Sequence, residues 1–178
     1  TAHDVPDYKR IRVEQAGNRG GIIWEQTVLR KYVRRRRDSI CLNLCNVTPL
    51  FMQPGITAIL DIMYKVNPSH YTTLRNRLSR LWHCLQYSYI TSHEKKIITI
   101  SNFCREEIVK YYPKAEGKIY VVPCAWQHVR EYKESSDWRE RYPFLEEKKF
   151  FFSLATLAKN KNGKWIIEAA RRNPQEIF

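Results

Sequence analysis

Residues 96–123 read KIITISNFCREEIVKYYPKAEGKIYVVP, with an apolar run at each end and helical signals between the two runs. The runs 96–101 and 118–123 have the length and the β-branched content of buried strands. Ser101 or Asn102 is a favourable N-cap for a helix that contains Cys104, Ile108, Val109 and Tyr112. A strand, a helix and a second strand in this order predict two parallel strands joined by a helix.

The same alternation extends through most of the chain. Further apolar runs at 39–47, 56–61 and 148–155 predict three more strands. Helices are expected over residues 21–33 and 163–172. Apolar strands separated by helices are typical of a parallel sheet that is covered on both faces. We therefore expect an α/β fold with a Rossmann-like, doubly wound parallel sheet.

A long helix is expected to begin at Pro68-Ser69. Its apolar residues recur at the three- and four-residue spacing of one helix face, so we expect this stripe to lie in the core. The stripe consists of Tyr71, Leu74, Leu78, Leu81, Trp82, Leu85 and Tyr89, and the other face carries Arg75, Arg77, Arg80 and His83.

Positive charge dominates the composition. The chain has 31 Lys and Arg against 18 Asp and Glu, a formal net charge of +13. Such a field attracts nucleic acid, an acidic membrane surface or phosphorylated substrates. The run Arg34–Arg37 is one candidate patch for an anionic membrane, and a solvated helix end is the plainer interpretation. The same two interpretations apply to Arg75, Arg77 and Arg80. Hydrophobic residues make up 43%, which suits a globular core and excludes a disordered composition.

Five cysteines lie in or beside apolar runs, at spacings that match neither a disulfide scaffold nor a zinc knuckle. Buried, reduced thiols are expected, which suits a cytoplasmic setting. A metal site is the remaining alternative. Its ligands would be Cys41, Cys45, His83 and Cys84.

Polar side chains follow several of the predicted strands. Asn46, Asp61 and Ser101 come at or near the ends of the first three strands, and His128 follows the fourth. Ligands of open α/β sheets bind at the carboxyl ends of the strands, so these side chains are candidates for a ligand cleft. Each has a structural alternative: a turn for Asn46, a cap for Asp61 or Ser101, and a plain loop position for His128.

Several short segments share an order and a spacing that are specific only in combination. They are LNLCNVTP at 42–49, IITISNF at 97–103, KIYVVP at 118–123, AWQH at 125–128, FFSLATL at 151–157, KN at 161–162 and IIEA at 166–169. In this combination the chain resembles the group 1 family of glycosyltransferases over roughly residues 21–178. Within that family it is similar to a bacterial subgroup that builds cell-surface polysaccharides.

The resemblance implies a GT-B fold, in which an active site lies between two Rossmann-like domains. Residues 1–124 would be a partial acceptor domain, 125–147 a linker, and 148–178 the first βα unit of the nucleotide-sugar domain. The implied reaction moves a hexose or deoxyhexose from a nucleotide-sugar to a glycan or lipid-linked acceptor. It implies no cofactor, no metal and no nucleic acid, and a cytoplasmic enzyme with peripheral contact at the membrane. The match is incomplete at both ends, so the piece alone is expected to be inactive.

By the same resemblance, Lys161 contacts the donor diphosphate, with Thr156 and Asn162 beside it. A fixed cation there would stabilise the charge that develops on the leaving nucleoside diphosphate. The family often has arginine at the position of Thr156 and glycine at that of Ala155, so Lys161 has less support here.

The acceptor side would be formed by Asn46, Asp61, Ser101 and His128. Asp61 is the candidate catalytic residue, either as general base or as the group that orients the acceptor hydroxyl. The family often has histidine before this aspartate, where this chain has Leu60.

A basic nucleic-acid-binding module is the alternative function. The charge, the arginine runs and the 13% of aromatic residues favour it. No helix-turn-helix, RNA-recognition or OB signature is present. Steeply salt-dependent binding to DNA, without a response to nucleotide-sugars, would support this alternative.

Overall fold

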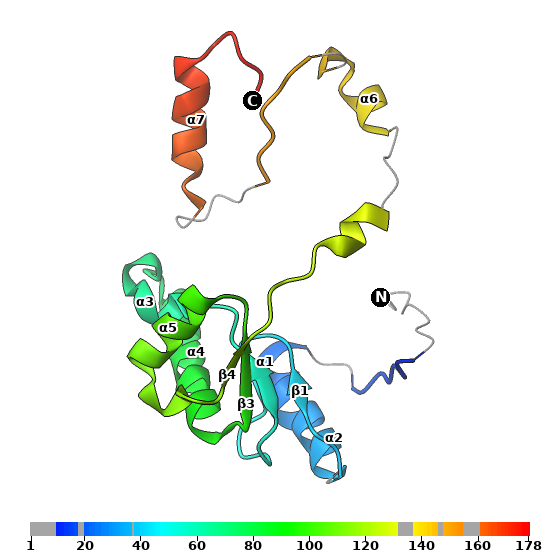
Figure 1. Cartoon of the computed structure of the whole chain (residues 1–178), viewed down its shortest axis with the longest axis vertical. Helices are drawn as coiled ribbons and strands as arrows, with labels where there is room; N and C mark the ends of the chain where they lie inside the picture. Colours follow the sequence, from blue (N-terminus) through cyan, green and yellow to red (C-terminus); the bar gives the residue numbers. More distant parts are fainter. Residues whose placement is uncertain (1–9, 18–19, 37, 132–136, 146–147, 155–160) are drawn as a thin grey trace. The chain divides into compact units, whose positions relative to one another are not determined.

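Four short parallel strands form one sheet in the order β1-β2-β3-β4 (Figure 1). Their bounds are Leu42–Asn43 for β1, Ile56–Ala58 for β2, Lys96–Thr99 for β3 and Ile119–Val121 for β4. In the register, Thr57 pairs with Ile97, which pairs with Ile119. The mixed α/β fold with a parallel sheet is confirmed, and each strand is shorter than its apolar run.

The computed structural model describes residues 10–17, 20–36, 38–131, 137–145, 148–154 and 161–178. The chain separates into two units, Thr1–Pro123 and Cys124–Phe178. All four strands belong to the first unit.

The predicted first helix is present as one continuous helical segment. It comprises α1 (Gly21–Trp24), the π-helical turn η1 (Glu25–Leu29) and α2 (Arg30–Arg34). Gln26 ties η1 to the loop after β1, because its side chain donates to the Thr48 carbonyl and accepts from the Leu50 amide.

Three helical segments connect β2 to β3, and two connect β3 to β4. The first three are α3 (Met63–Val66), the 3-10 turn η2 (Pro68–His70) and α4 (Leu74–His93). The other two are α5 (Asn102–Tyr111) and the 3-10 turn η3 (Pro113–Ala115). The Ser101 hydroxyl accepts the Cys104 amide at 3.1 Å, so the predicted N-cap of α5 is confirmed.

The long helix begins later than predicted. Residues 68–70 form the separate turn η2, and Thr73 caps α4 by accepting the Asn76 amide at 3.2 Å. Proline at the start of η2 favours a tight turn, and the threonine cap then sets a new helix start.

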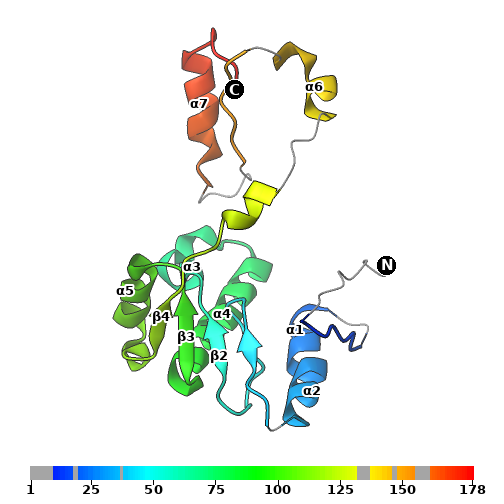
Figure 2. The ribbon, with the colours of Figure 1, turned by 45° about the vertical axis from the view of Figure 1, so that its right-hand side comes forward.

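The core lies between the sheet and the inner face of α4. Its fully buried members include Ile59, Tyr87, Ile90, Ile97 and Ile108. Figure 2 shows α4 behind the strands.

The predicted burial of the apolar stripe on α4 is wrong for its leucines. Leu74, Leu78, Leu81 and Leu85 are exposed, whereas Gln86, Tyr87, Ile90 and Thr91 are buried. A long-range polar contact helps to hold the face of α4 that carries Gln86 against the rest of the fold, because Gln86 accepts the Thr48 amide at 3.0 Å. Periodicity locates an apolar stripe but does not say which neighbour covers it.

Exposure differs between the middle and the edges of the sheet. In the middle, Thr57, Ile97 and Thr99 are fully buried on one face, and Ala58 on the other face is 3% exposed. Leu42 and Tyr120, on the edge strands β1 and β4, are about half exposed, at 54% and 48%. The order of the described strands does not reverse, and connections in one direction place their helices on one face. The doubly wound, Rossmann-like arrangement therefore stays a prediction.

The second unit contains short helices and no strand among its described residues. They are η4 (Gln127–Glu131), α6 (Asp137–Arg141), η5 (Pro143–Leu145) and α7 (Gly163–Arg172). The predicted strand at 148–155 is not formed over 148–154; residue 155 lies outside the described part. In this segment the Phe151 amide donates to the Ile177 carbonyl at 2.8 Å. The described part of this unit contains no second strand with which residues 148–154 could form a row of β-sheet hydrogen bonds.

None of the helices over the described ranges combines the length and the apolar character that crossing a membrane requires.

Candidate functional site

The ends of the first three strands meet at one edge of the sheet. Asn46 has a left-handed backbone, and its side-chain oxygen accepts the Leu60 amide at 2.7 Å. The Leu60 carbonyl in turn lies 3.4 Å from the Cys104 thiol in the first turn of α5, the turn that Ser101 caps. The carboxyl ends of parallel strands share an edge, and these two contacts connect the segments that follow β1, β2 and β3. The structure thus brings Asn46 and Ser101 together with the segment that carries Asp61.

Asp61 is exposed at this edge. Its Oδ1 accepts the Met63 amide at 2.9 Å, which closes a turn that leads into α3. Asn46, Ser101 and Asp61 therefore all have structural roles. The exposure of Asp61 leaves its carboxylate open to a ligand as well, as a general base requires.

A cluster of aromatic rings lies beside Asp61, and no motif or spacing predicted it. The Tyr64 ring stacks on Tyr71 at 4.6 Å and on His83 at 4.1 Å between centroids. Burial raises the pKa of the Tyr87 hydroxyl, and the nearby Asp61 carboxylate adds to this rise. Positions 61, 64, 71 and 83 follow no single period, so only the turn between α3 and α4 brings them together.

Burial lowers the pKa of His83, and the Asp61 carboxylate opposes this only in part. The buried Nδ1 of His83 has no hydrogen-bond partner among the described residues. A neutral imidazole is therefore favoured in the folded chain.

The free energy of unfolding is expected to fall as the pH drops below about 6.5, the ordinary pKa of histidine. In that range the unfolded chain takes up a proton at His83 that the folded chain resists. Urea titrations of wild type and His83→Gln at about pH 7.5 and pH 5.5 would measure this. The variant should lose part of the pH dependence, whereas His93→Gln, at an exposed histidine, should keep it. An unchanged pH dependence in His83→Gln would contradict the prediction.

The predicted diphosphate-binding residues belong to the second unit. Lys161 is exposed, and no other described residue pairs with it. Asn162 has a left-handed backbone, with φ of 49°, directly before α7. Its carbonyl accepts the Trp165 amide at 2.9 Å in the first turn of the helix. Thr156 lies outside the described residues.

His128, the remaining acceptor-side prediction, belongs to η4 in the second unit. Asp61 and Lys161 thus fall in different units, and the structure describes each set by itself.

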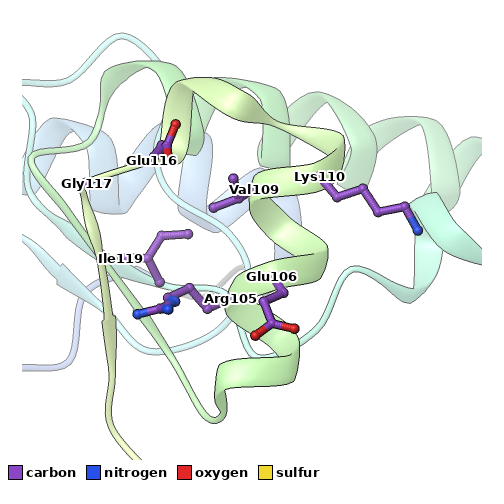
Figure 3. A pocket seen from close by; sticks show the side chains of 7 residues that line it. All are labelled: Arg105, Glu106, Val109, Lys110, Glu116, Gly117 and Ile119. Carbon is purple, nitrogen blue, oxygen red and sulfur yellow. The ribbon is translucent and has the colours of Figure 1, made fainter.

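A separate hollow of about 570 Å³ lies along α5 and the start of β4 (Figure 3). Two basic and two acidic side chains line it, so it has no net preference for a phosphate. It also lies beside the amino end of β4, away from the edge that carries Asp61. Its lining is Arg105, Glu106, Val109, Lys110, Glu116, Gly117 and Ile119.

The cysteines do not form a metal centre in the described part of the chain. No three His, Cys, Asp or Glu side chains gather there in a metal-binding group. All five cysteines are free thiols. The expected burial is wrong for Cys45 and Cys124, which are exposed because each lies just beyond a strand rather than inside it.

Comparisons with protein families, with curated proteins and with solved structures find no match to this chain. A parallel α/β sheet by itself serves many chemistries. Function is therefore inferred from the side chains at the strand ends and before α7.

Proposed function

We propose that this protein is a glycosyltransferase that moves a sugar from a nucleotide-sugar to a glycan or lipid-linked acceptor. The observation that carries the proposal is the shared edge of the sheet. There the ends of three parallel strands meet, and the exposed carboxylate of Asp61 lies among them.

In the proposed reaction, an acceptor hydroxyl oxygen attacks the anomeric carbon of the donor sugar. The bond from that carbon to the diphosphate oxygen breaks, and the nucleoside diphosphate leaves with the electron pair. Asp61 takes the hydroxyl proton. Asn46 and Ser101 keep the backbone at this edge in its conformation through their hydrogen bonds to the Leu60 and Cys104 amides. His128 is proposed to lie on the acceptor side.

Lys161 is proposed to hold the donor diphosphate. Its exposed ammonium precedes α7, where Asn162 and the free amides of the first helical turn add donors. Positive side chains there take the role of a metal, so no cofactor is proposed. GT-B architecture, a cytoplasmic location and a place in polysaccharide synthesis belong to the same proposal.

Replacing Lys161 with alanine is expected to weaken nucleotide-sugar binding about tenfold, the effect of losing one charge-assisted hydrogen bond. Saturation-transfer NMR with UDP-, GDP- and dTDP-linked sugars would measure the affinities. The matched control is Lys114→Ala, which removes the same charge from an exposed position in η3 and should change binding less than twofold.

Two results would count against the proposal. One is equal weakening by Lys161→Ala and Lys114→Ala. The other is no binding of any nucleotide-sugar, together with tight and steeply salt-dependent binding of random DNA, which is the behaviour of a nucleic-acid-binding module.

A further inference from the structure

A line of exposed leucines runs along α4. Their exposed fractions lie between 49% and 76%. At about 100° per residue they fall within about 60° of one another around the helix axis. They face away from the side on which Tyr87 and Ile90 are buried. We call this line the leucine seam, and it consists of Leu74, Leu78, Leu81 and Leu85.

Arginines border the leucine seam on both sides. By the same helical geometry Arg75 lies on one side and Arg77 on the other, and both are exposed. Arg80 lies further round on the Arg77 side, where its Nε donates to the Tyr64 carbonyl at 2.9 Å. The 20 residues of α4 include no Asp or Glu. An apolar strip with cationic borders is the pattern of a helix that lies in a membrane interface.

A hollow of about 320 Å³ adjoins the leucine seam. Arg77, Arg80 and Leu81 line it together with Ser69 and Thr72. Tyr71 lines it as well, so two guanidinium groups and three hydroxyls border one hollow, a set of donors that matches a negatively charged phosphate group.

We propose that α4 docks on an anionic lipid surface, with the leucine seam among the acyl chains and lipid phosphates at the bordering arginines. Buried leucine surface and attraction of arginines to anionic lipid both strengthen such binding. A second copy of this chain fits less well, because its α4 would bring no carboxylate to these arginines. The leucine seam is also shorter than the repeat that a coiled coil needs.

The arginines at the end of α2 and just after it, Arg34 to Arg36, are a weaker docking patch. Arg36 contacts the Glu14 carboxylate at 3.3 Å, and its guanidinium lies 3.6 Å from the centre of the Tyr32 ring. Part of that charge is therefore already neutralised. Arg34 and Arg35 remain exposed and serve as a charge-matched control.

Docking by α4 deepens the proposed function, because it would bring the enzyme to a lipid-linked acceptor. Its test uses lipid alone, with no nucleotide-sugar. Failure of docking and failure of sugar transfer are therefore distinguishable.

The test is co-sedimentation of the full chain with vesicles of phosphatidylcholine, with or without roughly one-third phosphatidylglycerol. Wild type should bind the anionic vesicles and scarcely bind pure phosphatidylcholine. Leu78→Ser/Leu81→Ser should weaken binding at least about tenfold, and Arg75→Gln/Arg77→Gln about ten- to thirtyfold. Arg34→Gln/Arg35→Gln should weaken it less than about threefold. Circular dichroism of each variant would confirm that it remains folded, as its exposed positions lead us to expect.

Three results would overturn the proposal. They are wild-type binding by the leucine variant, equal binding to both kinds of vesicle, and a larger loss from the α2 variant than from the α4 arginine variant. Concentration-dependent dimerisation that the leucine variant abolishes, without vesicle binding by wild type, would assign the leucine seam to a second copy instead.

Discussion

Replacing Ile97 with alanine is expected to lower the free energy of unfolding by about 3 kcal/mol, within the range measured for buried Ile→Ala changes. Ile97 is fully buried in β3 and is paired on both sides, with Thr57 and with Ile119. The change would remove buried methyl groups from the core cluster and leave a cavity between the sheet and the helices that cover it. Urea denaturation followed by circular dichroism would measure the loss.

Ile40→Ala is the matched control for this experiment. Ile40 is 67% exposed and lies before β1, so the same change should alter stability by less than about 0.5 kcal/mol. Similar losses for the two variants would mean that β3 is not at the centre of the core.

Glu94→Ala should lower the free energy of unfolding by a similar amount, about 2–4 kcal/mol, because it leaves two buried hydrogen-bond donors without an acceptor. Glu94 is only 5% exposed at the end of α4. One carboxylate oxygen accepts the Gly55 amide at 2.5 Å, and the other accepts the Thr48 hydroxyl at 3.1 Å. These bonds fasten the loop between β1 and β2 to α4. Urea denaturation, with the exposed Glu106→Ala as the control, would measure the effect.

A double-mutant cycle separates this contact from a general loss of charge. Thr48→Ala removes the hydroxyl that Glu94 accepts. The losses from Glu94→Ala and Thr48→Ala should therefore sum to more than the loss in the double variant, by about 1 kcal/mol. Strict additivity would contradict the coupling.

The βαβ unit of residues 96–123 was predictable because its local and long-range signals agree. The Ser101 cap, the apolar runs at both ends and the helix between them all favour the conformation that the sheet then stabilises. The meeting of Asn46 and Ser101 at one edge likewise followed from parallel topology alone.

The orientation of α4 was not predictable from its own residues. Its leucine stripe is more apolar than the face that is buried, but Gln86 and Glu94 bind a loop some 40 residues earlier in the chain. Such partners leave no periodic signal. The strand predicted at 148–155 is not formed over residues 148–154 for a related reason. A strand needs a second strand to hydrogen-bond with, and an apolar run alone does not show that such a partner exists.

The aromatic group beside Asp61 also depends on tertiary structure. Tyr64 and His83 come from different helices and meet because the chain breaks at η2 before α4 begins. The candidate site is therefore larger than the polar residues at the strand ends.

The proposed function makes its most direct claim about where a nucleoside diphosphate binds. Amide chemical shifts of the isotope-labelled chain, recorded during titration with the nucleotide-sugar that binds best, would locate the site. We predict that the largest changes fall at Lys161, Asn162 and the first turn of α7, and that in Lys161→Ala the changes in this segment need about tenfold more nucleotide-sugar to reach half their full size. Changes confined to other segments, or a titration that moves no amide while random DNA moves many, would contradict the claim.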